Sequence, residues 1–269
     1  MNPIQTAALV RARLDDTVVT RGLAESRSQA RAFILAGDVT VNGAVAMRAG
    51  AAVRASDAIA LVAKPRYVSR GGEKLAHALN QFGIDVQGIT VADFGASTGG
   101  FTDCLLQAGA ERVFAVDVGR GQLHERIRTD PRVTILDRTN ARLMTTLPVP
   151  VDLVTIDVSF ISLRLVLPAA ARVLSDRGTC IPLIKPQFEA GARDVGKGGV
   201  VRDPNVHCRV LGEVLAAAEA LGYGVLGLTR SPLKGPAGNV EFLAHLRLGQ
   251  ESVDGDQAID VVVGEGAIG

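Results

Sequence analysis

The sequence predicts a doubly wound α/β domain with a sheet of about seven strands, preceded by a small α+β domain. Three observations lead to this prediction. Short apolar runs alternate with helical stretches over most of the chain, as in a mainly parallel sheet covered by helices. The first of these runs ends in a glycine-rich turn that opens a helix. The first 64 residues instead combine short helices and strands around an Asn-Gly turn.

The composition is that of a globular protein. Of its 269 residues, 47% are apolar and 4% aromatic, so the chain can bury a sizeable aliphatic core. Its most apolar stretch, residues 165–174, is interrupted by Pro168 and Arg172, so we expect no membrane-spanning segment. The first sixteen residues lack the pattern of a secretory signal, and the three Cys residues form no disulfide or zinc pattern. We therefore expect a cytoplasmic protein with reduced thiols.

Residues 1–64 are expected to begin with two short helices. The first is predicted over Arg11–Thr20. The second follows a cap at Ser26 or Ser28 and ends at Gly37. So small a unit has little core, which favours a recognition module over a catalytic one.

Strands are expected to complete this N-terminal domain. Val39–Val41 leads into the turn Asn42-Gly43, a strong hairpin signal, and Val53 and 58–62 are expected to supply partner strands. Basic residues are concentrated in this part of the chain, since residues 1–68 carry nine Lys or Arg and five Asp or Glu. Such an excess is expected where a domain meets phosphate, although an ordinary solvated surface has the same appearance.

A linker over residues 65–72 is expected to separate this domain from a larger one over 73–269, because Pro65 keeps the chain extended and glycines follow. Five buried parallel strands are expected at Ile89–Phe94, Val113–Val118, Val133–Leu136, Leu153–Val158 and Cys180–Ile184. Helices are expected between them, including Thr102–Ala108, Leu163–Leu174 and Val206–Leu221. A final pair of strands is expected at Val225–Leu228 and Glu241–Leu248. In such a sheet, ligands bind at the carboxyl ends of the strands.

The first of these strands ends in a loop that is typical of nucleotide-type ligand sites. Its residues are Asp93, Phe94, Gly95, Ala96, Ser97, Thr98, Gly99, Gly100 and Phe101. The glycines allow a tight turn, and the helix N-terminus presents free N–H groups. An acid at Asp93 repels a pyrophosphate and attracts an ammonium, which favours an adenosyl ligand carrying an amino acid over a dinucleotide. A tight turn without a ligand is the alternative.

Two further residues are expected at this ligand. Asp117 ends the second strand, about 20 residues beyond the loop, where an acid accepts hydrogen bonds from a ribose. Asn140 follows the third strand and is expected to face the adenine, although a turn residue has the same signature. An Asp at a strand end is also a common helix cap.

Charged residues on four separate elements are expected to converge on the same edge of the sheet. These are Lys74, Asp157, Lys185 and Glu241. Asp157 and Lys185 end adjacent strands, and an unpaired charge there would be costly, so each is expected to need the other. Two surface salt bridges are the alternative interpretation.

Segments over most of the chain resemble the TlyA family, S-adenosylmethionine-dependent rRNA ribose methyltransferases that are often named hemolysins. In the larger domain these segments are Ser69–Leu75, Gly95–Thr102, Asp157–Ser162, Lys185–Glu189 and Ser231–Glu241. In the smaller domain, Arg13–Asp15, Arg21–Leu23, Ser26-Arg27 and Val39–Gly43 resemble an alpha-L RNA-binding module of the ribosomal small-subunit protein type. The linker differs, because Pro65–Val68 stands where some relatives have Arg-Ala-Trp-Val.

The resemblance implies a seven-stranded Rossmann-like methyltransferase sheet of the FtsJ type, with S-adenosyl-L-methionine as cofactor and no metal. It also implies 2′-O-methylation of cytidine in large-subunit rRNA, and for some members in small-subunit rRNA, within ribosomal subunits. The family's Lys-Asp-Lys-Glu tetrad carries over onto the four charged residues above. Cofactor binding is expected at Asp93, Gly95–Phe101, Asp117 and Asn140, and RNA binding at Arg11, Arg13, Arg27, Arg31 and Arg70.

Methylation of a ribose hydroxyl requires positioning and a base. Lys185 is expected to face the 2′-hydroxyl as that base, with the Lys74 cation favouring its neutral form. Asp157 would orient Lys185, and Glu241 would hold Lys74. The alternatives are a noncatalytic ribosome-binding or assembly factor, and a hemolysin.

Overall fold

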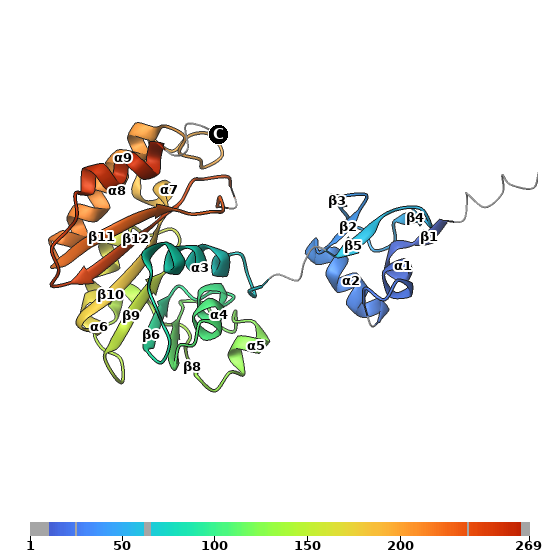
Figure 1. The fold of residues 1–269 in the computed structure, drawn as a ribbon, viewed down its shortest axis with the longest axis horizontal. Helices are drawn as coiled ribbons and strands as arrows, with labels where there is room; N and C mark the ends of the chain where they lie inside the picture. The colour runs from blue at the N-terminus through green and yellow to red at the C-terminus, as the bar shows by residue number, and fades with distance from the viewer. Residues whose placement is uncertain (1–10, 25, 62–65, 236, 265–269) are drawn as a thin grey trace, which may run out of the picture. The chain divides into compact units, whose positions relative to one another are not determined.

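A computed structural model describes residues 11–24, 26–61, 66–235 and 237–264 (Figure 1). The chain divides into two compact units, residues 1–65 and 66–269, and each is described by itself. The expected start of the linker at Pro65 and the last residue of the strand predicted over 58–62 lie outside the described residues.

The N-terminal unit combines two helices with two small antiparallel sheets around one apolar core. The helices are α1 (Leu14–Thr20) and α2 (Arg27–Ala36). One sheet pairs β1 (Arg11–Arg13) with β4 (Ala52–Arg54), and the other has the order β3 (Ala44–Val45), β2 (Val39–Val41), β5 (Ile59–Leu61). The core is formed by Leu14, Val18, Ala24, Ala30, Ile34, Val39 and Val53.

Local signals in this unit are confirmed, and two expectations that depended on tertiary pairing are wrong. Ser26 caps α2, and Asn42 and Gly43, with φ of 52° and 81°, form the hairpin turn between β2 and β3. Residues 11–13 form a strand instead of the first helical turn, because Ala12 pairs with Val53. The strand at Val53 therefore pairs with β1 and not with the hairpin.

The larger unit contains one seven-stranded sheet with the order β11-β12-β10-β9-β6-β7-β8. The strands are β6 (Thr90–Phe94), β7 (Arg112–Val116), β8 (Val133–Leu136), β9 (Val151–Ile156), β10 (Leu174–Ile184), β11 (Tyr223–Arg230) and β12 (Phe242–Leu248). Strands β6 to β10 are mutually parallel, and β12 runs antiparallel to both β10 and β11. The predicted α/β sheet of about seven strands is confirmed.

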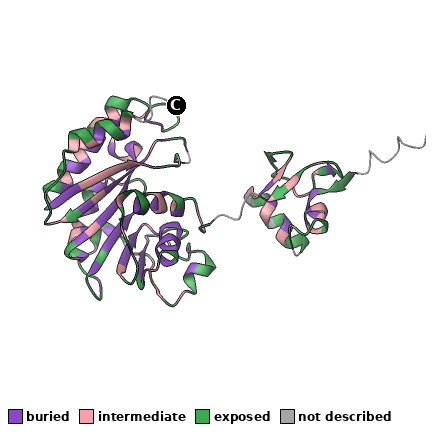
Figure 2. Cartoon of the chain, in the orientation of Figure 1, coloured by how far each residue is buried: buried purple, intermediate pink, exposed green. Residues whose placement is uncertain are grey.

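Helices cover both faces of this sheet, so its central strands are largely buried (Figures 1 and 2). One face packs against α3 (Gly71–Phe82), α4 (Gly100–Gln107) and α5 (Glu125–Arg128). The other packs against α6 (Leu167–Val173), α8 (Pro204–Glu219) and α9 (Gly255–Gly264). The short helices η1 (Ala141–Leu143), η2 (Leu163–Leu165) and α7 (Pro186–Glu189) follow strand ends. Among the described residues, no helix combines the length and the apolarity needed to cross a bilayer.

The helix boundaries differ from the sequence prediction in two places. Gly71 and Gly72, assigned to the linker, form the first turn of α3, where Tyr67 packs into the space that a side chain on Gly72 would fill. The helix expected over 163–174 is instead η2 followed by α6, because Leu174 already belongs to β10. The helices α3 and α9 were not predicted.

Candidate functional site

Two adjacent cavities lie at the carboxyl ends of the central strands. The first has a volume of about 480 Å³ and the second about 470 Å³. Four residues line both of them, namely Gly95, Ser97, Asp157 and Ser159. The first cavity is also lined by Lys74, Lys185 and Glu241, and the second by Asp117 and Asn140. The structure thus brings the predicted tetrad and the predicted nucleotide-type loop to one place.

The four charged residues form two ion pairs. Lys185 Nζ, directly after β10, lies 2.6 Å from Asp157 Oδ1, directly after β9. Lys74 Nζ, on α3, pairs with Glu241 Oε2, directly before β12. Lys74, Lys185 and Glu241 are buried, so these are not the two surface salt bridges that the sequence left open.

Buried charges of this kind are costly to desolvate even when they are paired. Replacement of such a pair by apolar residues is often neutral for stability, so two buried pairs at a cavity are candidates for a chemical role. Among the described residues, no group of three or more His, Cys, Asp or Glu side chains is placed to hold a metal ion.

Asp117, directly after β7, links the loop after β6 to its own loop. The N–H of Ser97 donates to Asp117 Oδ2 at 2.8 Å, and the N–H of Gly119 donates to Asp117 Oδ1 at 2.6 Å. Asn140 also lines the second cavity while its Oδ1 accepts from the N–H of Arg142, so it both faces the cavity and caps η1. Both residues therefore line the same cavity at the carboxyl ends of the strands.

Asp93 lies beneath the loop and lines neither cavity. Its side chain is fully buried, and its two oxygens accept hydrogen bonds from Thr102 at 2.7 Å and Thr155 at 3.0 Å. The expected contact with a ligand ammonium does not fit this placement. Burial raises the pKa of Asp93 to about 6, against the lowering effect of the two hydroxyls.

This raised pKa predicts a pH-dependent stability that Asp93→Asn removes. Between pH 4 and 6 the folded state keeps a proton that the unfolded chain has lost, so stability falls as pH rises through this window. A shift from 3.8 to about 6 corresponds to about 3 kcal/mol. Urea unfolding from pH 4 to 7 should show that loss in the wild type and not in Asp93→Asn. Parallel curves for the two proteins would contradict the assignment.

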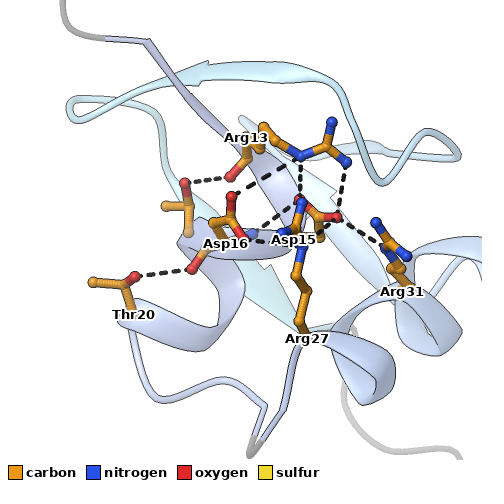
Figure 3. A network of polar contacts seen from close by, with 7 residues as sticks. Arg13, Asp15, Asp16, Thr20, Arg27 and Arg31 are labelled. Carbon is orange, nitrogen blue, oxygen red and sulfur yellow. Dashed lines mark hydrogen bonds and ion pairs between the residues drawn. The ribbon is translucent and has the colours of Figure 1, made fainter.

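The arginines predicted to bind RNA lie in both units. In the N-terminal unit, Asp15 is fully buried and accepts hydrogen bonds from Arg13 at 2.9 Å, Arg27 at 3.2 Å and Arg31 at 3.0 Å (Figure 3). The Arg13 guanidinium, supported by the other two, holds the pKa of this carboxyl well below its usual range. Each guanidinium side chain stays about half exposed. The buried Asp15 carboxylate therefore holds three arginine side chains close together on one surface of this unit.

The two remaining predicted arginines belong one to each unit. Arg11 is exposed on β1. Arg70 lines the first cavity and donates to the carbonyl of Lys234 at 2.6 Å. Lys234 itself also lines that cavity, which the sequence did not indicate.

Two residues at the cavities were missed although they follow Asp157 in the same motif. Ser159 accepts a hydrogen bond from Lys185 Nζ at 3.0 Å. Phe160 is 90% exposed, lines the second cavity and has a φ of 62°, which is rare for a bulky residue. Its ring lies 5.0 Å from that of Phe188. Strain and exposure of this kind are frequent at functional sites.

Comparison with known proteins identifies the family of each part of the chain. The profile of the FtsJ-like methyltransferases matches residues 67–248, and that of the S4 domain matches residues 12–59. The chain is 48% identical to the 16S/23S rRNA (cytidine-2′-O)-methyltransferase TlyA of Mycobacterium tuberculosis, over 88% of this chain and 90% of the relative. It is 43% identical to Hemolysin A of Brachyspira hyodysenteriae, over 87% and 98% of the two chains.

Solved structures agree with the same class. A structure from Streptococcus thermophilus, named as a hemolysin, superposes with a TM-score of 0.76 at 42% identity, covering 96% of each chain. The larger unit is an FtsJ-like methyltransferase domain, and an S4 domain precedes it in the chain. The chain belongs to the TlyA family of FtsJ-like methyltransferases.

Proposed function

We propose that this protein transfers a methyl group from S-adenosylmethionine to the ribose 2′-hydroxyl of a cytidine in rRNA. The observation that carries the proposal is the Lys185–Asp157 pair at the wall between two cavities, one suited to an adenosyl group and the other to an acceptor. The names of the relatives support the rRNA substrate. A cytoplasmic location follows from that substrate.

The residues present fit the cofactor. Asp117 and Asn140 would hold its adenosyl part in the second cavity, and the main chain of the Gly95–Gly100 loop would approach it closely. When bound, S-adenosylmethionine supplies an electrophilic methyl group on a cationic sulfur. Lys185 then accepts the proton of the 2′-hydroxyl at Nζ, while Lys74, held by Glu241, adds positive charge to the same cavity.

Aromatic and basic residues around the cavities suit an RNA strand. The exposed ring of Phe160 offers a face on which an unpaired base stacks, the usual mode of recognition of single-stranded RNA. Arg70 and Lys234 at the first cavity are placed to contact a phosphate near the target nucleotide. In the S4 domain, the Arg13, Arg27 and Arg31 cluster supplies further phosphate contacts.

Replacing two arginines of this cluster is expected to weaken binding to ribosomal subunits and to flatten its salt dependence. The double variant Arg27→Gln, Arg31→Gln loses two phosphate contacts, which lowers the slope of log affinity against log salt by about 2. Arg48→Gln, an exposed arginine of the same domain, is the matched control. Binding titrations at several salt concentrations measure the slope. An unchanged slope in the double variant would exclude these contacts.

The proposed function is tested by incubating the full chain with isolated ribosomal subunits and labelled S-adenosylmethionine. We expect label in rRNA as 2′-O-methylcytidine, mapped by mass spectrometry of nuclease fragments. Subunit binding without label in rRNA would instead support the noncatalytic ribosome-binding alternative. Running large and small subunits separately shows which rRNA is the substrate.

A further inference from the structure

Ser159 lies within hydrogen-bond distance of Lys185 Nζ. Lys185 Nζ donates to Ser159 Oγ at 3.0 Å and lies 2.6 Å from Asp157 Oδ1. Ser159 follows Asp157 by two residues, and both line the two cavities. One loop therefore supplies two acceptors to the same nitrogen.

A lysine ammonium has three N–H bonds arranged tetrahedrally around its nitrogen, opposite the bond to Cε. Two of these bonds are fixed by acceptors of the protein, so a single direction is left. We propose that Ser159 is a positioning residue that, together with Asp157, aims this remaining direction of Lys185 at the hydroxyl to be methylated. With only one acceptor, two directions would remain open, and the lone pair of the neutral amine could take either of them.

The loop that carries Ser159 is tied to the segment that carries Lys185. Glu189, buried at the end of α7, accepts hydrogen bonds from Ser162 Oγ at 2.6 Å and from the N–H of Leu163 at 2.7 Å. Helix α7 begins directly after Lys185. Glu189 thereby fixes the loop after β9 against the end of β10, which keeps Ser159 within reach of Lys185.

This inference rests on the proposed function and adds a geometric requirement to it. In the neutral amine, the remaining direction holds the nitrogen lone pair instead of an N–H. The O–H bond of the acceptor breaks as a new N–H bond forms on Lys185, and the electron pair of the O–H bond stays on the oxygen. That oxygen becomes the nucleophile. An amine turned away from the acceptor cannot take the proton.

Ser159 also affects the balance between the two forms of Lys185. A hydroxyl that accepts from the ammonium favours the charged form. The other charged groups that line this cavity are Asp157 after β9, Lys74 on α3, Glu241 before β12, and Arg70 and Lys234. Loss of the Ser159 hydroxyl removes one interaction with the ammonium and leaves these charges in place.

The test compares Ser159→Ala, Ser159→Thr and the control Ser175→Ala, which lies near the opposite end of β10. Single-turnover methylation is measured from pH 6 to 10. We expect Ser159→Ala to lower the plateau rate at least about tenfold and to move the rising limb of the pH–rate profile to lower pH. Ser159→Thr should recover much of the rate because its hydroxyl remains, and Ser175→Ala should match the wild type.

A second readout does not depend on activity. With 13C-labelled lysine, the Lys185 Cε signal, assigned from Lys185→Arg, should titrate at lower pH in Ser159→Ala than in the wild type. A wild type that produces no methylated rRNA overturns the proposed function. The titration of the Lys185 Cε signal then still tests the interaction between Ser159 and Lys185. Identical titrations and rates in Ser159→Ala and the wild type overturn the positioning role. A lower plateau without any shift in either profile indicates a merely structural effect and overturns it too.

Discussion

Lys185→Ala is expected to slow single-turnover methyl transfer by about 10² to 10⁴, the contribution usual for a positioned general base. A ribose hydroxyl is a poor nucleophile near neutral pH, and Lys185 Nζ lies at the cavity with its partners Asp157 and Ser159 already fixed. Cofactor and subunit binding should change little, because this substitution does not alter the Gly95–Gly100 loop or the S4 domain. Single-turnover conditions are needed so that product release does not mask chemistry.

Lys185→Arg distinguishes a role of Lys185 as a base from a role as a positive charge. Arginine keeps the cation but does not give up its proton, so it should be nearly as inactive as alanine if Lys185 is the base. If Lys185→Arg is active, or Lys185→Ala reacts at nearly the wild-type rate, Lys185 only positions the substrate.

The sheet was predictable because its signals are local. Buried parallel strands read as apolar runs, and the runs at 133–136 and 180–184 fall within β8 and β10. Residues 11–13 were misassigned because their strand exists only through pairing with residues 52–54, far along the chain. Helix α3 was not predicted, and its first turn was assigned to the linker because Gly71 and Gly72 resemble a linker unless the packing of Tyr67 is known.

The site residues, too, were predictable where the signal is local and not where it depends on tertiary contacts. Asp157 and Lys185 were expected to pair because the ends of adjacent parallel strands meet at one edge, and they do. Asp93 was assigned to the ligand because an acid before the glycine-rich loop would attract an ammonium, but its side chain accepts from Thr102 and Thr155 beneath the loop. The role of Ser159 depends on a loop anchored by Glu189, and no local pattern reports that contact.

Gly95→Ala is expected to weaken S-adenosylmethionine binding by about 10²-fold or more. Gly95 has a φ of 85°, and a Cβ there would lie 2.5 Å from the carbonyl oxygen of Asp157. The obstacle is backbone, so no side chain can rotate away from it. Either the loop or the end of β9 must shift, and both line the two cavities. A displacement costing about 3 kcal/mol gives this loss of affinity.

Gly222→Ala is the matched control for backbone strain. Gly222 has the same φ of 85°, but a Cβ there meets nothing within 4 Å. Both variants therefore share the left-handed penalty of about 1 to 2 kcal/mol in stability, and only Gly95→Ala adds the clash with Asp157. Calorimetric titration of the folded variants with S-adenosylmethionine should leave Gly222→Ala at wild-type affinity. If Gly95→Ala also binds S-adenosylmethionine with wild-type affinity, the loop after β6 does not form the cofactor site. The clash must shift either that loop or the end of β9, and a cofactor bound by the loop would lose contacts in both cases.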